Sequence, residues 1–300
     1  MNTHSNRKRQ IISAAYVLIA GILWGTIGLF VRSLAGFNLS SLEIAALRSL
    51  SVAVTLSVFL FFYNKKLLII KIKDLWCFIG TGVISLTSFN ICYFSTISMT
   101  SLAVAATLLY TAPAFVMVLS FFIFKESLGV GKIIAVVMAF VGCVFVTGVI
   151  SDGAALRPAG ILLGLGSGIG YALYTIFGRF ALNRGYDSLT ITFYTVLCSS
   201  VSTLPLLDFR KLAQMEMHDP ELVVIVFFMG LICTALPYFF YNKGLIGLEG
   251  GQASVIASIE PVAATIIGVL VFKESPAAMT IIGMTLVIGS IIIVNIKTGK

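Results

Sequence analysis

The chain has 300 residues, of which 59% are hydrophobic and only 11% charged, and its formal net charge is +8. Soluble globular proteins carry about 25% charged residues, so too few polar residues remain here to cover a water-facing surface. The composition excludes a soluble enzyme, a disordered chain and a nucleic-acid-binding protein, and it indicates an integral membrane protein.

Ten apolar stretches are long enough to cross a bilayer as helices, for which about 20 residues are needed. They are residues 11–31, 42–62, 75–95, 102–123, 130–150, 159–180, 187–207, 222–242, 251–272 and 277–296. The apolar runs are continuous and do not alternate, which excludes a transmembrane β-barrel. The first stretch is too long for the apolar core of a signal peptide. The predicted fold is therefore all-α, with ten transmembrane helices and an uncleaved first helix.

Lysine and arginine residues are divided unequally between the two sides of these spans. If the N-terminus is cytoplasmic, the inner ends hold fourteen of them: Arg7, Lys8, Arg9, Lys65, Lys66, Lys71, Lys73, Lys125, Lys132, Arg179, Arg184, Lys243, Lys297 and Lys300. The outer ends hold five, namely Arg32, Arg157, Arg210, Lys211 and Lys273. Because cytoplasmic loops carry the excess of positive charge, both termini are predicted to be cytoplasmic, in the inner membrane of a bacterial cell.

The second half of the sequence repeats the first. Phe-Lys-Glu-Ser at 124–127 recurs at 272–275, 148 positions later, and Pro113 falls on Pro261. At an offset of 147, Arg32 falls on Arg179. Residues 11–150 and 159–296 are thus predicted to be two five-helix repeats, and an odd number of helices inverts the second repeat in the membrane. Inverted repeats are typical of secondary transporters, although a duplicated bundle could also serve as a channel or scaffold.

The repeated stretches resemble a known family. YTAPAFVMVLSFFIFKESLGVGKIIAVVMAFVGCVFV at 110–146 and SIEPVAATIIGVLVFKESPAAMTIIGMTLVIGSIIIV at 258–294 are similar to the EamA-type repeats of the drug/metabolite transporter superfamily. The Trp24-Gly25 motif in the first span is similar as well. The resemblance covers nearly the whole chain. It implies a ten-helix carrier of small organic molecules, commonly an exporter of amino acids or related metabolites, without indicating which substrate.

Two ionisable residues lie well inside predicted spans, where a charge is costly and marks a functional candidate. Glu260 lies near the middle of span 9, immediately before Pro261, and its counterpart in the first repeat is Ala112. We predict that Glu260 takes part in proton coupling or contacts a polar substrate. The alternative is a structural role, in which Glu260 hydrogen-bonds a neighbouring helix close to Pro261. The resemblance favours the structural role at least as much as the functional one, because similar second repeats often carry Glu-Pro at this position.

Arg48 is the other charge, roughly 9 Å below the outer end of span 2 at 1.5 Å per residue. Glu43 lies five positions earlier, about 140° around the helix, and is therefore poorly placed to pair with it. Three interpretations remain open. Arg48 could extend to the outer headgroups, since a long side chain can place its charge at the interface. It could instead reach Glu260, or bind the carboxylate of a substrate.

Three prolines are predicted to kink helices. Pro113 and Pro261 fall in the middle of spans 4 and 9, and Pro237 falls within span 8. A proline frees a backbone carbonyl, and in a bilayer a freed carbonyl must face protein or a water-filled cavity. Spans 4 and 9 are therefore predicted to be cavity walls, unless the kinks serve packing alone.

Polar and aromatic residues within the spans are candidates for lining such a cavity. Tyr and Trp combine an apolar face with one hydrogen-bonding group, which suits an amphipathic or aromatic guest. The offset of 147 places Trp24 opposite Tyr171. Tyr16, Tyr63, Tyr93 and Tyr241 lie at helix ends, where an interfacial belt is the simpler explanation. The candidates are Trp24, Thr26, Asn90, Tyr110, Tyr171, Tyr174, Tyr238, Asn242 and Ser258.

Several chemistries receive no support from the sequence. The histidines are His4 and His218, the five cysteines all lie within spans, and no P-loop is present. No catalytic residue, metal or cofactor is therefore expected. Span 6 carries glycines at a spacing of four, such as Gly160 and Gly164, which predicts close helix packing.

The sequence predicts a non-enzymatic secondary transporter for small organic metabolites, working by alternating access. Its expected partners are the substrate, the lipid bilayer and either protons or an exchanged solute, and a monomer would suffice. A passive channel or facilitator, or an exporter of drugs, sugars or nucleosides, is the alternative.

Overall fold

The computed structural model describes residues 3–151, 153, 157–207 and 220–296. Predicted outer-side residues Arg210 and Lys211, inner-side residues Lys297 and Lys300, and His218 lie outside this part of the chain. Within it, all regular structure is helical and no strand is present. The all-α prediction is confirmed.

The described residues contain ten helical spans long and apolar enough to cross a membrane, as predicted. They are Arg7–Phe37, Ser41–Tyr63, Ile72–Met99, Leu102–Phe124, Val130–Thr147, Pro158–Asn183, Ser188–Leu206, Pro220–Leu245, Gly250–Phe272 and Ala278–Asn295. Each coincides with one predicted stretch to within a few residues at most ends. The differences lie at the helix ends, where helical structure continues past the apolar stretch, as at Ile72–Met99.

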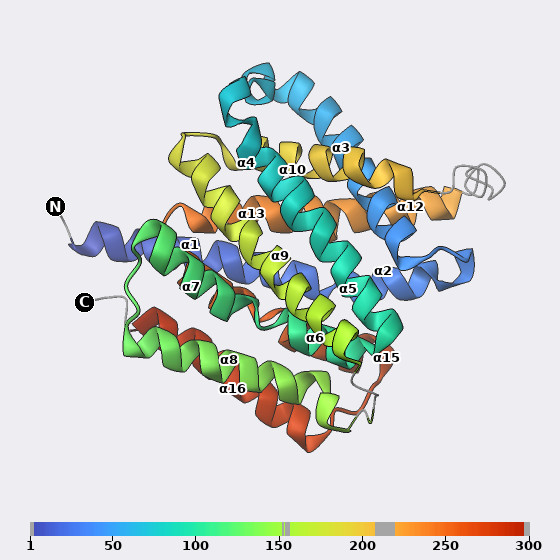
Figure 1. Cartoon of the computed structure of the whole chain (residues 1–300), viewed down its shortest axis with the longest axis vertical. Helices are drawn as coiled ribbons and strands as arrows, with labels where there is room; N and C mark the ends of the chain where they lie inside the picture. Colours follow the sequence, from blue (N-terminus) through green and yellow to red (C-terminus); the bar gives the residue numbers. More distant parts are fainter. Residues whose placement is uncertain (1–2, 152, 154–156, 208–219, 297–300) are drawn as a thin grey trace.

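The spans consist of the following helices, labelled as in Figure 1. The first five spans contain α1 (Thr3–Gly25), α2 (Ile27–Ser33), α3 (Ser41–Tyr63), α4 (Leu75–Ile79), α5 (Ser88–Met99), α6 (Leu102–Leu109), α7 (Ala112–Phe124) and α8 (Val130–Thr147). The last five contain α9 (Pro158–Asn183), α10 (Ser188–Thr203), α12 (Pro220–Gly230), α13 (Leu236–Leu245), α14 (Gly250–Ala257), α15 (Glu260–Phe272) and α16 (Ala278–Ile296).

The helices pack mainly between the two halves of the chain. Helix α1 contacts α13, α14 and α15, while α9 contacts α5, α6 and α7. Helices α8 and α16 lie side by side along one edge of the bundle (Figure 1). Helix α1 begins and α16 ends on the same side of the molecule (Figure 1). We call the end of the bundle where α1 begins the α1 end, and the end where α2 finishes the α2 end.

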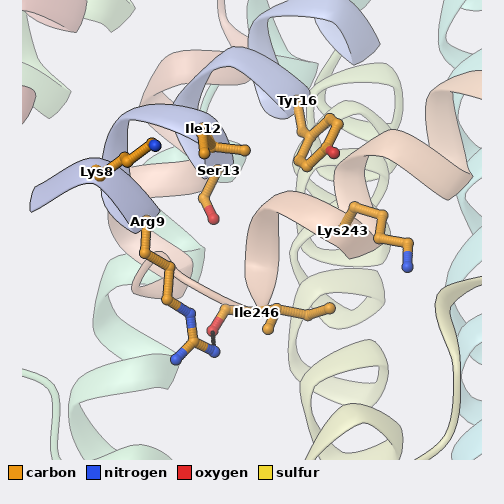
Figure 2. Close-up of a pocket in the computed structure, with 7 residues that line it drawn as sticks. All are labelled: Lys8, Arg9, Ile12, Ser13, Tyr16, Lys243 and Ile246. Carbon is orange, nitrogen blue, oxygen red and sulfur yellow. Dashed lines mark hydrogen bonds between the residues drawn. The ribbon is translucent and has the colours of Figure 1, made fainter. Parts of the chain in front are cut away.

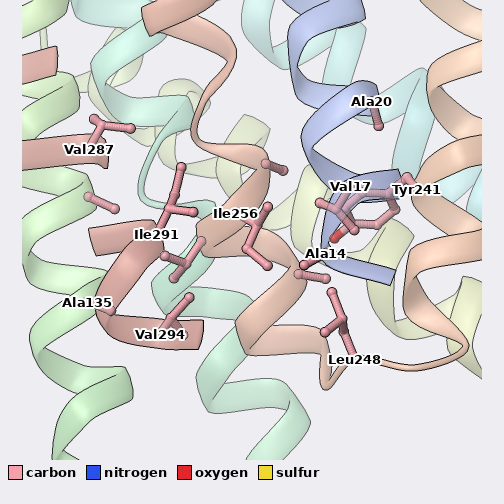
Figure 3. Packing of buried hydrophobic residues seen from close by; sticks show 14 of the residues in the cluster. Ala14, Val17, Ala20, Ala135, Tyr241, Leu248, Ile256, Val287, Ile291 and Val294 are labelled. Atoms are coloured by element: carbon pink, nitrogen blue, oxygen red, sulfur yellow. The ribbon is translucent and has the colours of Figure 1, made fainter. Parts of the chain in front are cut away.

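The largest apolar core joins α1, α8, α13, α14 and α16 (Figure 3). Val17 and Ile256 are fully buried at its centre. Tyr241 is also buried there, with 1% exposed, and its hydroxyl shares a hydrogen bond of 2.8 Å with Thr175. The interfacial role considered for Tyr241 is therefore wrong, because Trp24 of α1 and Tyr174 of α9 pack against this ring inside the bundle. Tyr63, by contrast, is exposed at the end of α3.

Helices α8 and α16 approach so closely that their backbones touch at two glycines. A Cβ atom added to Gly283 would lie 2.6 Å from the carbonyl oxygen of Gly142, and one added to Gly142 would lie 2.8 Å from that of Gly283. Small residues permit such contacts in membranes, where close packing is the main source of helix association. The predicted tight packing of α9 is also confirmed, since Gly164 abuts Leu108 of α6.

Substitution of Gly283 by Ala is expected to destabilise the protein by about 2–3 kcal/mol, because the added methyl group forces two backbones apart. The thermal unfolding midpoint in detergent should fall accordingly. Gly289→Ala on the same helix is the matched control. There the new Cβ meets only the end of the Met138 side chain, at 3.2 Å, and alanine favours the helix by about 1 kcal/mol. Equal losses in the two variants would contradict a specific backbone contact.

Spans 4 and 9 are interrupted, and this differs from the kinks predicted at the prolines. Helix α6 ends at Leu109 and α7 begins at Ala112, so Pro113 lies in the first turn of a new helix. Pro261 has the same place in α15. Proline is favoured at this position because the first amides of a helix have no partner within it. Pro237 lies in the first turn of α13, directly after a π-helical turn at Leu231–Ala235.

Candidate functional site

Two small cavities meet at Tyr171, in the middle of the bundle. One is lined by Leu109, Tyr110, Ala112, Pro113, Tyr171, Ser254, Ala257, Ser258 and Glu260. The other is lined by Trp24, Ser85, Leu86, Phe89, Tyr171, Tyr174 and Tyr238. Each has a volume of about 10 Å³, enough for about one water molecule. The interrupted spans 4 and 9 thus form walls of the first cavity.

Aromatic rings from both halves of the chain form the wall of the second cavity. The ring centres of Trp24 and Tyr171 are 6.0 Å apart in an edge-to-face arrangement, and those of Trp24 and Tyr238 are 5.4 Å apart. Tyr174 and Tyr238 are 4.7 Å apart. Trp24 and Tyr171, which the repeat placed in matching positions, therefore touch each other. Edge-to-face contacts of this kind stabilise a fixed arrangement of rings.

Hydrogen bonds behind the rings hold this arrangement. The side-chain amide of Asn242 donates to the Tyr174 hydroxyl at 2.8 Å and to Thr192 Oγ1 at 3.3 Å. Asn242 is fully buried, so it positions Tyr174 and does not line a cavity. Thr26, another sequence candidate, bonds to the carbonyl of Leu23 at 2.7 Å. It therefore closes the turn between α1 and α2, outside both cavities.

Glu260 begins α15 at the break in span 9, and its side chain lines the first cavity. Among the described residues, no side chain or backbone amide forms a hydrogen bond or ion pair with its carboxyl group. The structural alternative, in which Glu260 bonds a neighbouring helix, therefore has no contact to support it in this conformation. A carboxylate in apolar surroundings without a partner is strongly disfavoured. Its environment calls for a proton or a cationic group.

Arg48 lies in α3 and is buried, with 7% of the residue exposed. This burial within the bundle contradicts the interpretation that the side chain extends to the headgroups. Nε of Arg48 is a buried donor without a partner, and within the described part of the chain no carboxylate pairs with the guanidinium. The pair with Glu260 is absent from this conformation. Glu260 lines its cavity together with Tyr171, whose ring contacts Trp24 in the aromatic cluster.

Asn90 is a further buried group without a partner. It lies in α5, 3% of it is exposed, and its Nδ2 atom donates to no described group. Asn90 lies outside both cavities. Sequence reasoning overlooked Ser85 and Phe89, which line the second cavity. They lie at the π-helical segment Gly80–Thr87 and the start of α5. The sequence carried no signal for these two residues, because a π-helical segment has no clear sequence pattern. Such a segment also changes which residues of the span face the cavity.

A larger pocket of about 350 Å³ lies at the α1 end, between α1 and α13 (Figure 2). Lys8, Arg9 and Lys243 surround it, and Nη2 of Arg9 donates to the carbonyl of Ile246 at 3.3 Å. It shares no lining residue with the two central cavities. We therefore place the candidate site at the central cavities. Among the described residues, no group of three His, Cys, Asp or Glu residues could hold a metal ion.

Comparison with known sequences assigns the chain to a family. The sequence model of the EamA-like transporter family matches residues 11–148 and again residues 158–296. The chain belongs to this family. As an EamA-like transporter with ten apolar spans, the protein is a multi-pass membrane transporter.

Relatives of this EamA-like transporter extend over its whole length. An uncharacterized transporter of Archaeoglobus fulgidus is 28% identical over 96% of this chain and 98% of its own length. The uncharacterized transporter YwfM of Bacillus subtilis is 26% identical over 96% and 95%. The uncharacterized inner membrane transporter YicL of Salmonella typhimurium is 22% identical over 95% of both chains. A solved crystal structure matches with a TM-score of 0.78 at 18% identity, covering 95% of this chain and 96% of the other, which confirms the fold.

Proposed function

We propose that this EamA-like transporter is a secondary carrier that exports an amino acid or a related zwitterionic metabolite by alternating access. The observation that carries the proposal is the presence of two unpartnered charges of opposite sign within the spans, the buried Arg48 and the partly buried Glu260, which lines a cavity beside the aromatic cluster. Arg48 would bind the carboxylate of the substrate, and Glu260 would bind its ammonium group. The rings of Trp24, Tyr171 and Tyr238 would contact its side chain. A zwitterion satisfies both charges at once, whereas a sugar or nucleoside satisfies neither.

Paired contacts support the part of the proposal that concerns inverted repeats. Arg179 pairs with Glu126, and the residues 147 and 148 positions away, Arg32 and Glu274, form the same ion pair. Both family matches cover one predicted repeat each. Two inverted halves around a central site permit access from either side in turn. The excess of lysine and arginine predicted for the α1 end supports a cytoplasmic position for both termini.

The size of the cavities supports a carrier over a channel. Two cavities with room for about one water molecule each cannot hold an amino acid, so the site must open to take one. The interruptions at residues 110–111 and 258–259 supply flexible points in spans 4 and 9, and discontinuous helices are typical of carriers. The sequence also shows no ring of charged residues of the kind that lines a channel. Transport without chemical conversion is therefore proposed.

Counterflow into proteoliposomes tests this function. Vesicles preloaded with unlabelled amino acids, with aromatic and branched side chains represented, should accumulate the same labelled compound transiently and saturably. A pH gradient across the membrane should change the rate if protons are exchanged through Glu260. Flux that does not saturate would favour the facilitator. Counterflow with sugars, nucleosides or drugs, and none with amino acids, would overturn the zwitterion assignment.

A further inference from the structure

Each end of the bundle carries the same ion pair, formed by equivalent residues of the two halves. At the α1 end Arg179 donates to Glu126, and at the α2 end Arg32 donates to Glu274. The lysine before each glutamate has a left-handed backbone, with φ of 58° at both Lys125 and Lys273. Each arginine also lies near the ring of an equivalent phenylalanine, Phe124 or Phe272. The local structure of the two pairs is therefore alike.

Burial of the two pairs differs greatly. The side chains of Arg179 and Glu126 are 22% and 8% exposed, whereas those of Arg32 and Glu274 are 54% and 50% exposed. An exposed ion pair contributes little to stability, whereas a buried, hydrogen-bonded one is costly to break. In this conformation only the pair at the α1 end ties the two halves firmly.

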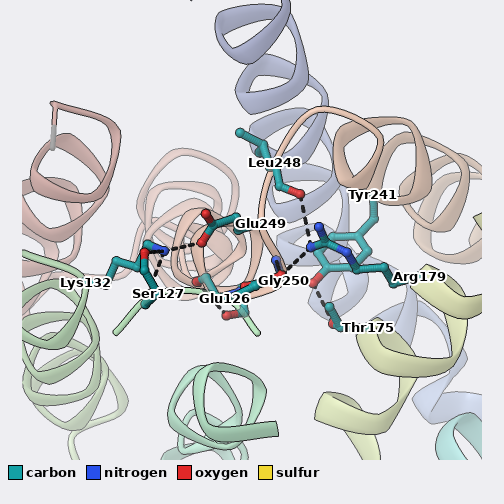
Figure 4. A network of polar contacts seen from close by, with 11 residues as sticks. Glu126, Ser127, Lys132, Thr175, Arg179, Tyr241, Leu248, Glu249 and Gly250 are labelled. Atoms are coloured by element: carbon teal, nitrogen blue, oxygen red, sulfur yellow. Dashed lines mark hydrogen bonds and ion pairs between the residues drawn. The ribbon is translucent and has the colours of Figure 1, made fainter. Parts of the chain in front are cut away.

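Glu126 does more than pair with Arg179 (Figure 4). Its carboxylate accepts hydrogen bonds from the backbone amides of Gly250 at 2.9 Å and Gly251 at 3.4 Å, the first two residues of α14. A carboxylate is favoured at the start of a helix, where amides lack partners and the helix dipole is positive. A residue of the first half thereby holds the start of a helix in the second half. Helix α14 leads directly to the cavity, which Ser254 lines.

A second contact reinforces this tie. Lys132 of α8 pairs with Glu249, the residue that precedes α14, and also donates to the carbonyl of Ser127 at 2.9 Å. Figure 4 shows the side chains of Lys132, from the first turn of α8, and Glu126, from the segment just before α8, close to the start of α14. Gly250 is needed for this close approach, since a Cβ there would lie 2.8 Å from Ser120 Oγ, whereas one on Gly251 would meet Met117 at an ordinary contact distance of 3.6 Å. The start of α14 is thus enclosed by the first half.

The equivalent helix at the α2 end is held differently. The side chain of Ser101 caps α6 by accepting from the amide of Val104 at 3.1 Å. The amides equivalent to those of Gly250 and Gly251 belong to Leu102 and Ala103. In the described part of the chain Glu274 forms no bond with them, although its counterpart Glu126 binds the equivalent amides of α14. The two ends of the bundle therefore show one motif in two states, one engaged and one released.

We propose that Glu126 and Glu274 are gate residues that engage alternately during the transport cycle. In this conformation Glu126 closes the α1 end by holding Arg179 and the first turn of α14. When that end opens, Glu126 releases α14, and Glu274 binds the first turn of α6 together with Arg32, which closes the α2 end. This inference deepens the proposed function, because it assigns residues to the alternating-access step on which that function rests.

The gates can be measured without any substrate, by distances between spin labels in the full-length protein reconstituted in liposomes. The α1 end is reported by labels at Leu128→Cys and Asn183→Cys, and the α2 end by labels at Ser33→Cys and Ser275→Cys. All four positions are exposed. The native cysteines are replaced in both labelled proteins, so that only the introduced cysteines carry labels.

Glu126→Gln is expected to shift the α1-end pair to longer distances and the α2-end pair to shorter ones. The ratio of open to closed molecules should rise on the order of tenfold, the effect of losing a charged hydrogen bond. Adding Glu274→Gln should reverse much of this shift, because it weakens the closed state of the α2 end. Lys125→Gln, which removes a neighbouring exposed charge, is the matched control and should leave both distributions unchanged.

Unchanged distances in Glu126→Gln, or a further opening when Glu274→Gln is added, would overturn the proposal. If Glu126→Gln does not yield folded protein, Lys132→Gln replaces it, alone and with Glu274→Gln, and the same shifts are expected. A shift in the label distances without counterflow of any amino acid would contradict the proposed substrate, while the gate proposal would still stand. Counterflow of an amino acid without a shift in the label distances would contradict the gate proposal, while the carrier function would still stand.

Discussion

Replacement of Arg48 by Met is expected to abolish amino-acid transport while making the protein more stable. The guanidinium is buried and no described carboxylate pairs with it, so the folded protein carries the cost of an unpaired charge. Methionine has a similar length and an adaptable apolar side chain. Removing the charge should therefore stabilise the fold by about 1–3 kcal/mol. Loss of the substrate carboxylate's partner should reduce transport about a hundredfold.

Counterflow and the thermal unfolding midpoint, measured on the same preparation, check both halves of this prediction. Arg157→Met is the control, since Arg157 is exposed before α9 and should change neither quantity appreciably. A variant at Arg48 that retains transport and loses stability would contradict the prediction. That outcome would assign Arg48 a structural role in the bundle.

Replacement of Glu260 by Gln is expected to reduce transport of amino acids by about a hundredfold as well, because the substrate ammonium loses its counter-charge. Glutamine keeps the shape of the side chain and cannot exchange a proton at neutral pH. Any dependence of the rate on a pH gradient should therefore disappear from the residual activity. Ser258→Ala is the matched control on the same cavity wall. Its hydroxyl bonds to the carbonyl of Ser254 at 3.3 Å, so a much smaller loss is expected.

The rate of counterflow by Glu260→Gln, measured at several values of pH, tests this prediction. A variant that keeps both its rate and its pH dependence would contradict a role for Glu260 in binding or coupling. Analogues then separate the two charges. A substrate analogue without its carboxylate should be indifferent to the change at Arg48 and sensitive to the change at Glu260. An analogue without its amino group should show the opposite pattern.

The helical spans were predictable because a bilayer leaves few alternatives. A segment of about 20 apolar residues must satisfy its backbone internally, and a helix does so. All ten spans were therefore found, and the equivalence of Trp24 and Tyr171 led to two rings that touch. The repeat also located Pro113 and Pro261 correctly at equivalent positions, although these prolines start new helices and do not bend continuous ones.

The candidate site was predictable only in part, since burial depends on the neighbours that a side chain meets. Arg48 could extend to the headgroups as a residue of an isolated helix, but it is buried when α3 packs into the bundle. Asn242 resembled a cavity residue and instead supports Tyr174 from behind. The pairing of Glu126 with Arg179 was also missed. Both residues recur at offsets of 148 and 147, and that shared recurrence was the signal that could have revealed them.

The glycine contact between α8 and α16 limits the kind of movement that the bundle can make. Helices α8 and α16 are the last helices of the two halves, and Gly142 and Gly283 bring their backbones together. Interlocked backbones resist sliding along each other but permit a small rotation about the point of contact. In the proposed carrier this point would act as a fulcrum, because the travel of a helix end grows with its distance from the point of contact. A rotation of a few degrees there would open one end of the bundle by the same motion that closes the other.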